Sequence, residues 1–591
     1  MQTVSQGWKD NQNERLVSES FVEVILSLSD PDALEDATAT DNGAATISNT
    51  AEIVNEVDED IKPYVTLEKN LWVLDGSREV FASNVGNTGY VGSMMSAANM
   101  SYATSPQATV SFSEVHTKVI PGITIVWSTA FNEFAVDFTV KAFNGATEVA
   151  SVSVTGNTES QSIILMDIAN YNKILISVSK WCSPNHRPRI EKVLVGVEKV
   201  YSKSDLFSFN HTQDIDPFSA ELPKSEISFS MDNSEDEYNP NNLQGLAKYL
   251  IERQEIKARY GFKVNGAKEW VDCGTFYMCE WDAPQKGITA SFTARDILEF
   301  MTDNYYYGVY NPSGTSLYNL ATDVLTKANL PLNADGTQKW LIDDSLKNIS
   351  TVAPLPIDTS ANCLQLIANA AGCTMYQDRK GVLHIKPLGK SVTDYTISHF
   401  NSYSPSEISL SKPLKNVEVS SYNYTVATDM SELYKDTVAI SGTKEILITY
   451  SSATNVTASV SGGTLNSAKY YSNACVLNIT ASGNVTITVT GYNLESSSAK
   501  VITASGASGE TISVDNPLIT SHARASAIGV LMEEYMSSRK ILKSSWRADP
   551  RVDAGDVVKN ENDYNTNNVL MTNVAFSYNG AFRGSGEGRV V

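Results

Sequence analysis

Short segments with the alternating pattern of β-strands recur along most of this chain, and turn residues separate them. In residues 21–28, four apolar side chains alternate with Glu23, Ile25 and Ser27, and only Ile25 departs from the pattern. Such alternation predicts a strand with one buried face. Residues 64–75 are also strand-like, and residues 30–60 have the polar composition of a loop or arm.

The chain has 591 residues, which is more than one hydrophobic core normally supports, so we expect about three to five domains. Apolar residues at helical spacing predict helices in residues 315–328 and 360–371, and a hairpin follows at 374–385. The predicted fold class is therefore mainly β with a few helices (α+β), in a multidomain chain.

Composition excludes several kinds of site. The net charge of -22 disfavours wrapping of nucleic acid, because phosphate binding needs clustered Lys and Arg. The six cysteines include no Cys-x-x-Cys pair, so we expect no metal site and no cofactor. No apolar run reaches the roughly 18 residues of a membrane span, and residues 1–10 do not resemble a secretory signal.

Two ordered sets of motifs point to one family. The first set comprises residues 515–518 (Asp-Asn-Pro-Leu), 546–550 (Trp-Arg-Ala-Asp-Pro), 554–558 (Ala-Gly-Asp-Val-Val) and 578–581 (Tyr-Asn-Gly-Ala). With a predicted helix after its first motif, this set resembles the end of a phage tail hub protein. The second set resembles the first β-barrel of the same family and comprises residues 216–217, 226–231, 238–240, 255–261, 274–278 and 288–300.

Residues 89–200 resemble a different fold. The segments 123–127, 138–143 and 189–196 are similar to those of a discoidin-like, galactose-binding jelly roll. Such sandwiches often bind carbohydrate, so the resemblance makes four loop residues candidate glycan contacts: Trp127, Trp181, His186 and Arg187. Aromatic residues in sandwiches more often pack in the core, and we keep that alternative open.

The patterns and resemblances together divide the chain into six parts. They are residues 1–88 (N-terminal strands and arm, part of the first hub barrel), 89–200 (discoidin-like sandwich), 201–310 (main part of the first hub barrel), 311–425 (helix-and-hairpin hub domain), 430–500 (immunoglobulin-like insertion) and 510–591 (C-terminal part of the second hub domain).

The hub resemblance implies a structural virion protein rather than an enzyme. It implies a homotrimer at the tail tip, made in the cytoplasm of the bacterial host, that joins the tail tube or distal tail protein to the tip or baseplate. Tape measure, tip and fibre proteins are further implied partners. DNA could pass through such a hub without sequence-specific binding, and the jelly roll leaves a host-surface glycan open as a partner.

Two other functions are weighed beside the hub: a glycan-binding adhesin, and a cell-wall glycan hydrolase with accessory β-sandwiches. The hydrolase would need two carboxyl groups about 5 to 9.5 Å apart, and no motif in the sequence marks such a pair. We predict no catalytic residues. Five residues are expected to serve the fold or a subunit interface: Trp546, Arg547, Asp549, Asp556 and Asp296, the last as a helix cap.

Overall fold

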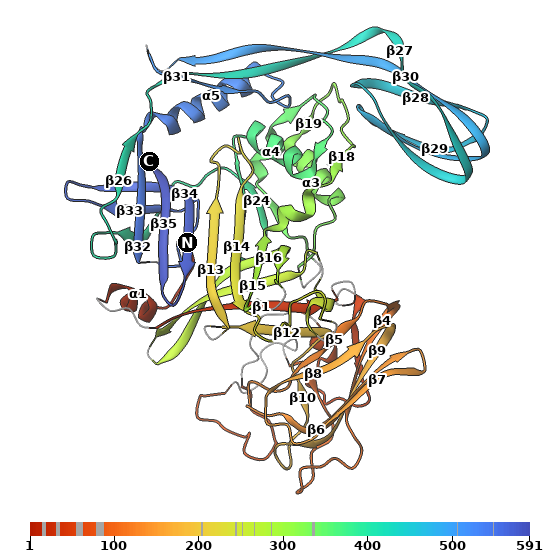
Figure 1. Cartoon of the computed structure of the whole chain (residues 1–591), viewed down its shortest axis with the longest axis vertical. Helices are drawn as coiled ribbons and strands as arrows, with labels where there is room; N and C mark the ends of the chain where they lie inside the picture. Colours follow the sequence, from red (N-terminus) through yellow and green to blue (C-terminus); the bar gives the residue numbers. More distant parts are fainter. Residues whose placement is uncertain are drawn as a thin grey trace.

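The computed structural model describes residues 1–14, 19–30, 33, 36–54, 63–78, 88–202, 205–242, 245–250, 252–264, 266–284, 287–333, 337–504, 506, 508–547 and 549–591. The chain is mainly β with a few helices, so the predicted fold class is confirmed. Figure 1 shows a sandwich at the bottom, a large sheet in the middle, a helical unit above it and a long arm across the top.

A 13-stranded sheet forms the centre of the protein. Its main path runs through β12 (Gly196–Tyr201), β1 (Ser20–Ser29), β15 (Glu255–Val264), β16 (Ala267–Asp282), β17 (Thr289–Arg295), β14 (Lys224–Asp232), β13 (Leu206–Asp214), β34 (Thr566–Tyr578), β35 (Phe582–Val590), β32 (Lys540–Arg547) and β26 (Glu407–Leu410). Off this path, β33 (Val557–Glu561) pairs with β34 and with β25 (Val392–Ile397).

The sheet has two halves, which meet where β13 pairs antiparallel with β34. The register runs from Phe209 opposite Tyr578 to Asp214 opposite Asn573, and we call this pairing the seam. One cluster of buried side chains includes Phe209 from the first half and Phe576 from the second. The strands that we assigned to two hub barrels therefore lie in one sheet over one core.

Two sheets with a shared core make up the sandwich. One contains β2 (Thr38–Asp41), β4 (Gln107–His116), β9 (Tyr171–Trp181), β6 (Ala135–Asn144) and β7 (Thr147–Val154), and the other contains β11 (Lys192–Leu194), β5 (Ile120–Val126) and β8 (Gln161–Ile168). The short pair β3 (Tyr90–Val91) and β10 (Arg189–Ile190) and the 3-10 helix η1 (Thr50–Val54) complete it. The strand predicted at 64–75 is wrong, because these residues form turns, with Asn70 at a positive φ of 63°.

The helical unit confirms both predicted helices and the hairpin. It contains η3 (Ile297–Met301), β18 (Asn304–Tyr305), β19 (Thr315–Ser316), α3 (Leu317–Lys327), β20 (Trp340–Ile342), η4 (Asp344–Asn348), β21 (Ser350–Thr351), β22 (Asp358–Thr359), α4 (Ser360–Ala370), β23 (Thr374–Gln377), β24 (Leu383–Lys386) and α5 (His522–Ser537). Two further helices are α1 (Gln6–Asn13) and η2 (Ala247–Tyr249). Among the described helices, none is long and apolar enough to cross a membrane.

The arm is one long hairpin of β27 (Leu414–Thr449) and β30 (Ala474–Ala504). Its base packs on α5, and its far end carries β28 (Ala453–Ser461) and β29 (Thr464–Tyr470), which both pair with β30 (Figure 1). β31 (Glu510–Val514) pairs parallel with β27 at the base. At the far end, Ala453 pairs with Asn493 of β30, and its N–H donates to the carbonyl of Ser472 just before β30, so the ribbon folds back on itself around a core of its own. The predicted immunoglobulin-like insertion stays a prediction.

A glycine makes room for the side chain of Trp546 in the second half of the sheet. Trp546 is fully buried and lies opposite Gly584 on the neighbouring strand. A Cβ atom at Gly584 would lie 2.8 Å from Trp546 Cε2, closer than side-chain atoms approach in folded proteins.

We therefore predict that Gly584→Ala destabilises the protein by about 1–3 kcal/mol, because it overpacks the site. Thermal unfolding measures the effect, with Gly483→Ala as the matched control, since a Cβ atom at Gly483 meets open space. Equal unfolding midpoints for the two variants would show that Trp546 is not held against β35.

Candidate functional site

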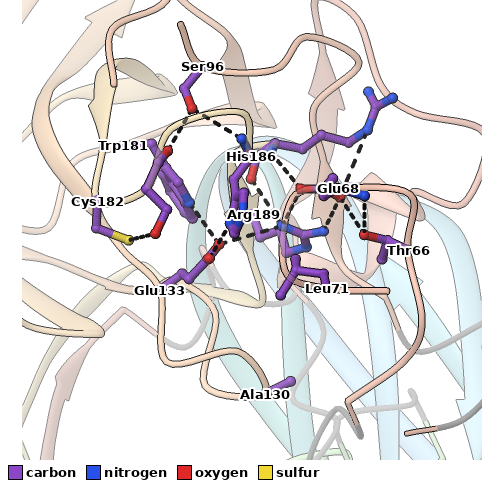
Figure 2. Close-up of polar contacts among 12 residues, drawn as sticks. Thr66, Glu68, Leu71, Ser96, Ala130, Glu133, Trp181, Cys182, His186 and Arg189 are labelled. Carbon is purple, nitrogen blue, oxygen red and sulfur yellow. Dashed lines mark hydrogen bonds and ion pairs between the residues drawn. The ribbon is translucent and has the colours of Figure 1, made fainter. Parts of the chain in front are cut away.

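Four ionisable side chains lie buried together at one end of the sandwich (Figure 2). Glu68, Glu133, His186 and Arg189 are each no more than 5% exposed. Glu133 lies just before β6, His186 lies in the loop after β9, and Arg189 begins β10. Glu68 comes from the turns at residues 63–78, so the cluster joins segments that are far apart in the sequence.

Arg189 is the centre of this cluster. Its Nη1 donates to Glu68 Oε2 at 3.1 Å, its Nη2 also pairs with Glu68, and its Nη1 lies 3.7 Å from Glu133 Oε2. Burial by itself lowers the pKa of the guanidinium, but Tyr64 and Glu68 outweigh it and raise that pKa. Arg189 therefore keeps its charge inside the protein.

His186 faces an acceptor on each side of its ring. Its Nδ1 pairs with Glu133 Oε1, and its Nε2 pairs with the backbone carbonyl of Lys69. A carbonyl oxygen only accepts, so Nε2 donates the hydrogen bond to Lys69, while Nδ1 shares a hydrogen bond with Glu133. Glu133 thus links His186 to Arg189.

The same residues position the neighbouring backbone. Trp181 Nε1 donates to Glu133 Oε2 at 2.9 Å, and the backbone N–H of Arg187 donates to Glu68 Oε2 at 2.7 Å. The cluster thus fixes the turn around Glu68 against the loop between β9 and β10. It is a structural fastening, since its carboxylates are buried and already paired.

The predicted glycan contacts need correction on this basis. Trp127 and Trp181 are 0% exposed and pack edge to face, 6.1 Å apart, so they cannot offer a surface to a sugar. His186 is held by Glu133 and Lys69, and Arg187 Nη1 donates to the carbonyls of Gly92 and Ser93. The packing alternative accounts for Trp127 and Trp181, and burial holds His186 away from solvent, whereas Arg187 is partly exposed and stays a predicted contact.

The sequence reasoning missed the other members of the cluster. Glu68 and Glu133 lie in turn-rich segments without periodicity, and no sequence signal pairs either of them with Arg189. In the described part of the chain, no group of three or more His, Cys, Asp or Glu side chains could hold a metal ion.

A second buried cation joins three parts of the protein. Arg379 lies in the turn between β23 and β24 and is 5% exposed. Its Nη1 donates to the carbonyl of Asp272 on β16 at 2.8 Å, while Nη2 donates to the carbonyl of Val552 at 3.2 Å and Nε to Asp553 Oδ1 at 2.6 Å. Burial raises the pKa of Asp553, but Arg379, the N-terminal amine and Gln2 together more than offset this, so that pKa is lowered. We call this contact the Arg379 junction.

Four of the predicted structural residues surround the N-terminal segment. Asp549, which is 0% exposed, accepts from Trp8 Nε1 at 3.3 Å, and Arg547 Nη2 donates to the carbonyl of Gln12 at 2.9 Å. Asp556 accepts from the amine of Met1 at 2.6 Å and from the N–H of Asp553 at 2.8 Å. Together with Trp546 in the core, they hold α1 against the second half of the sheet within one chain.

Asp296 is the N-cap of η3, which is a short 3-10 helix. Its carboxyl accepts from the N–H of Leu298 at 3.1 Å and from the N–H of Ser225 at 2.9 Å. Burial raises the pKa of Asp296 to about 7, although these two hydrogen bonds lower it in part.

Comparison with known proteins gives structural neighbours only. No protein-family model matches the chain, and no curated protein matches it. Among solved structures, the 43 kDa tail protein of prophage MuSo2 from Shewanella oneidensis is 11% identical, with a TM-score of 0.37 over 66% of this chain and 95% of that one. A tail protein from Neisseria meningitidis MC58 is 10% identical, with a TM-score of 0.39 over 67% and 94%. The E. coli c3393 protein, a component of the type VI secretion system, is 9% identical, with a TM-score of 0.31 over 66% and 74%.

We predict that Glu133→Gln loosens the turns at residues 63–71. The change removes the carboxylate that faces buried Arg189 and is hydrogen-bonded to His186, and breaking a buried ion pair in this way costs about 3–5 kcal/mol. Hydrogen exchange at residues 63–71 measures it. Glu148→Gln is the control, because the Glu148–Lys141 pair is largely exposed and contributes little. Equal exchange in the two variants would contradict a fastening role.

The raised pKa of Asp296 predicts a pH dependence. The ordinary value is 3.8, so folding favours the protonated carboxyl, and its contribution is lost as pH rises from about 4 to about 7. Asp296→Asn keeps an acceptor oxygen without the charge. As the pH rises from about 4 to about 8, the free energy of unfolding of this variant should increase by roughly 4 kcal/mol relative to that of the parent protein.

Denaturant unfolding at several pH values measures that gain. Asp343→Asn is the matched control, since Asp343 is the exposed N-cap of η4 and the Ser345 hydroxyl lowers its pKa. A stability difference between Asp296→Asn and the parent that stays constant with pH would refute the assignment.

Proposed function

We propose that the chain is a structural tail hub, which joins the tail tube to the distal tail tip or baseplate of a phage or phage-like particle. The observation that carries the proposal is where the two ordered motif sets fall. Residues 226–231, 255–261 and 274–278 lie on β14, β15 and β16, whereas 546–550 and 578–581 belong to the ends of β32 and β34. The strand-forming motifs of the two sets thus lie in the two halves of one sheet.

A homotrimer follows from the same proposal. Each chain brings both halves of the sheet as one body, so three copies would place six halves around a channel, which is the arrangement that the hub resemblance implies. The proposed partners are the tube or distal tail protein, the tape measure protein, and tip or fibre proteins. The net charge of -22 suits a channel wall along which DNA slides without binding.

We assign the chain no catalytic role and no glycan site at the buried tryptophans. The proposed location is the tail tip of the virion, after synthesis in the bacterial cytoplasm. Electron microscopy of the purified protein, together with its mass in solution, tests the proposal. It predicts a ring with threefold or pseudo-sixfold symmetry, and a stable monomer at high protein concentration would contradict it.

The arm provides a second test, because its far end has a hydrophobic core of its own. Val426 and Leu494 are register partners on β27 and β30, so an Asn-Gly turn can replace residues 427–493 between them. We predict that this shortened protein keeps the oligomeric state of the parent in size-exclusion chromatography. Loss of the oligomer would place the arm within the subunit interface.

A further inference from the structure

The long hairpin of the arm is interrupted at one place. Val426 pairs with Leu494 and Met430 pairs with Tyr492, so residues 427–429 on β27 stand opposite Asn493 alone. A second irregularity follows between Glu432 and Tyr434. Extra residues on one strand leave ladder hydrogen bonds unmade and bend the strand. On its other edge, β30 is paired at this place, since Ala453 lies opposite Asn493 and the N–H of Leu494 donates to the carbonyl of Ser452, so the ladder is interrupted on the β27 side.

Beyond the bulges, the arm is a module with its own core. This tip module, residues 430–492, buries Ile440, Val485, Ile487 and Val489 together in a cluster separate from the other cores. Cores that are separate in this way let a segment move as a rigid body. The base of the arm differs, since Val417 and Val419 belong to the core of the helical unit.

The turn between β29 and β30 contacts the helical unit. The N–H of Ser472 donates to the carbonyl of Gly308 at 2.7 Å, and Ser472 Oγ accepts from the N–H of Tyr310 at 2.8 Å. Asn473 Nδ2 donates to the carbonyl of Leu355 at 3.3 Å. Within the described residues, these are the hydrogen bonds between the tip module and the helical unit.

One aromatic contact completes the turn. Tyr471 meets Tyr307 edge to face, with ring centroids 5.1 Å apart. These hydrogen bonds and this ring contact come from residues 471–473, which we call the latch.

We propose that the tip module is a hinged arm, with the bulge at 427–429 as its hinge and residues 471–473 as a latch that holds it against the helical unit. Opening the latch swings the module away as a folded body and uncovers the backbone of Gly308 and Tyr310. Movements of this kind need a few residues that absorb the change in backbone angles, and the bulge supplies them.

The double variant Tyr471→Ala/Ser472→Ala tests the latch in the full-length protein. We expect exchange of the Tyr310 amide to rise at least about tenfold, as expected for the loss of one hydrogen bond and one ring contact. Particle images should show the arm in several positions, while the amides of Val485 to Val489 keep their protection. Ser482→Ala, on an exposed part of β30, is the control and should behave as the parent.

The hinge has a separate test. Deleting Thr428 and Asp429 from the latch variant leaves one residue opposite Asn493 and restores regular pairing. We expect the arm to return to one position in the images. The proposal is overturned if the latch variant keeps a single arm position, if the tip core loses protection together with the latch, or if the deletion leaves the arm as variable as before.

Discussion

The pairing of β13 with β34 is the constraint on which the rest of the structure depends. It makes one sheet of strands from the middle and the end of the chain, and the buried side chains of both halves then form one cluster. Because the halves share backbone hydrogen bonds and a core, neither can turn against the other. The sandwich is attached to this sheet through β1 and β12, and the helical unit through the Arg379 junction, while the arm packs on α5 of the helical unit.

Buried charges fasten the attached units, and each is compensated. Arg379 meets Asp553 at the junction, Arg551 meets Asp549 beneath α1, and Arg189 meets Glu68 in the sandwich. A buried pair of this kind adds little net stability, but the loss of one partner is costly, so it ties the geometry to one arrangement.

Much of the local structure was predictable from the sequence, and the long-range arrangement was not. The spacing of Leu317, Ala321 and Val324 predicts α3, and the alternation in residues 21–28 predicts β1, since both patterns act over a few residues. Nothing in residues 206–214 indicates that they pair with residues 566–578. A surface role for Trp127 and Trp181 is compatible with their local sequence, because burial depends on the whole fold. The strands of the arm follow the same pattern whether they form one sheet or two, so the pattern does not reveal the topology of the arm.

The seam can be tested most directly by native-state hydrogen exchange at increasing denaturant. If the two halves are one cooperative unit, the amides of β13 and β34 should exchange with the same opening free energy and the same dependence on denaturant as those of β14 and β35. If instead the amides of β34, β35 and β32 exchange through an opening of lower free energy while β13 to β17 stay protected, the halves are independent domains. That result would contradict the central claim that the seam makes the two halves one body.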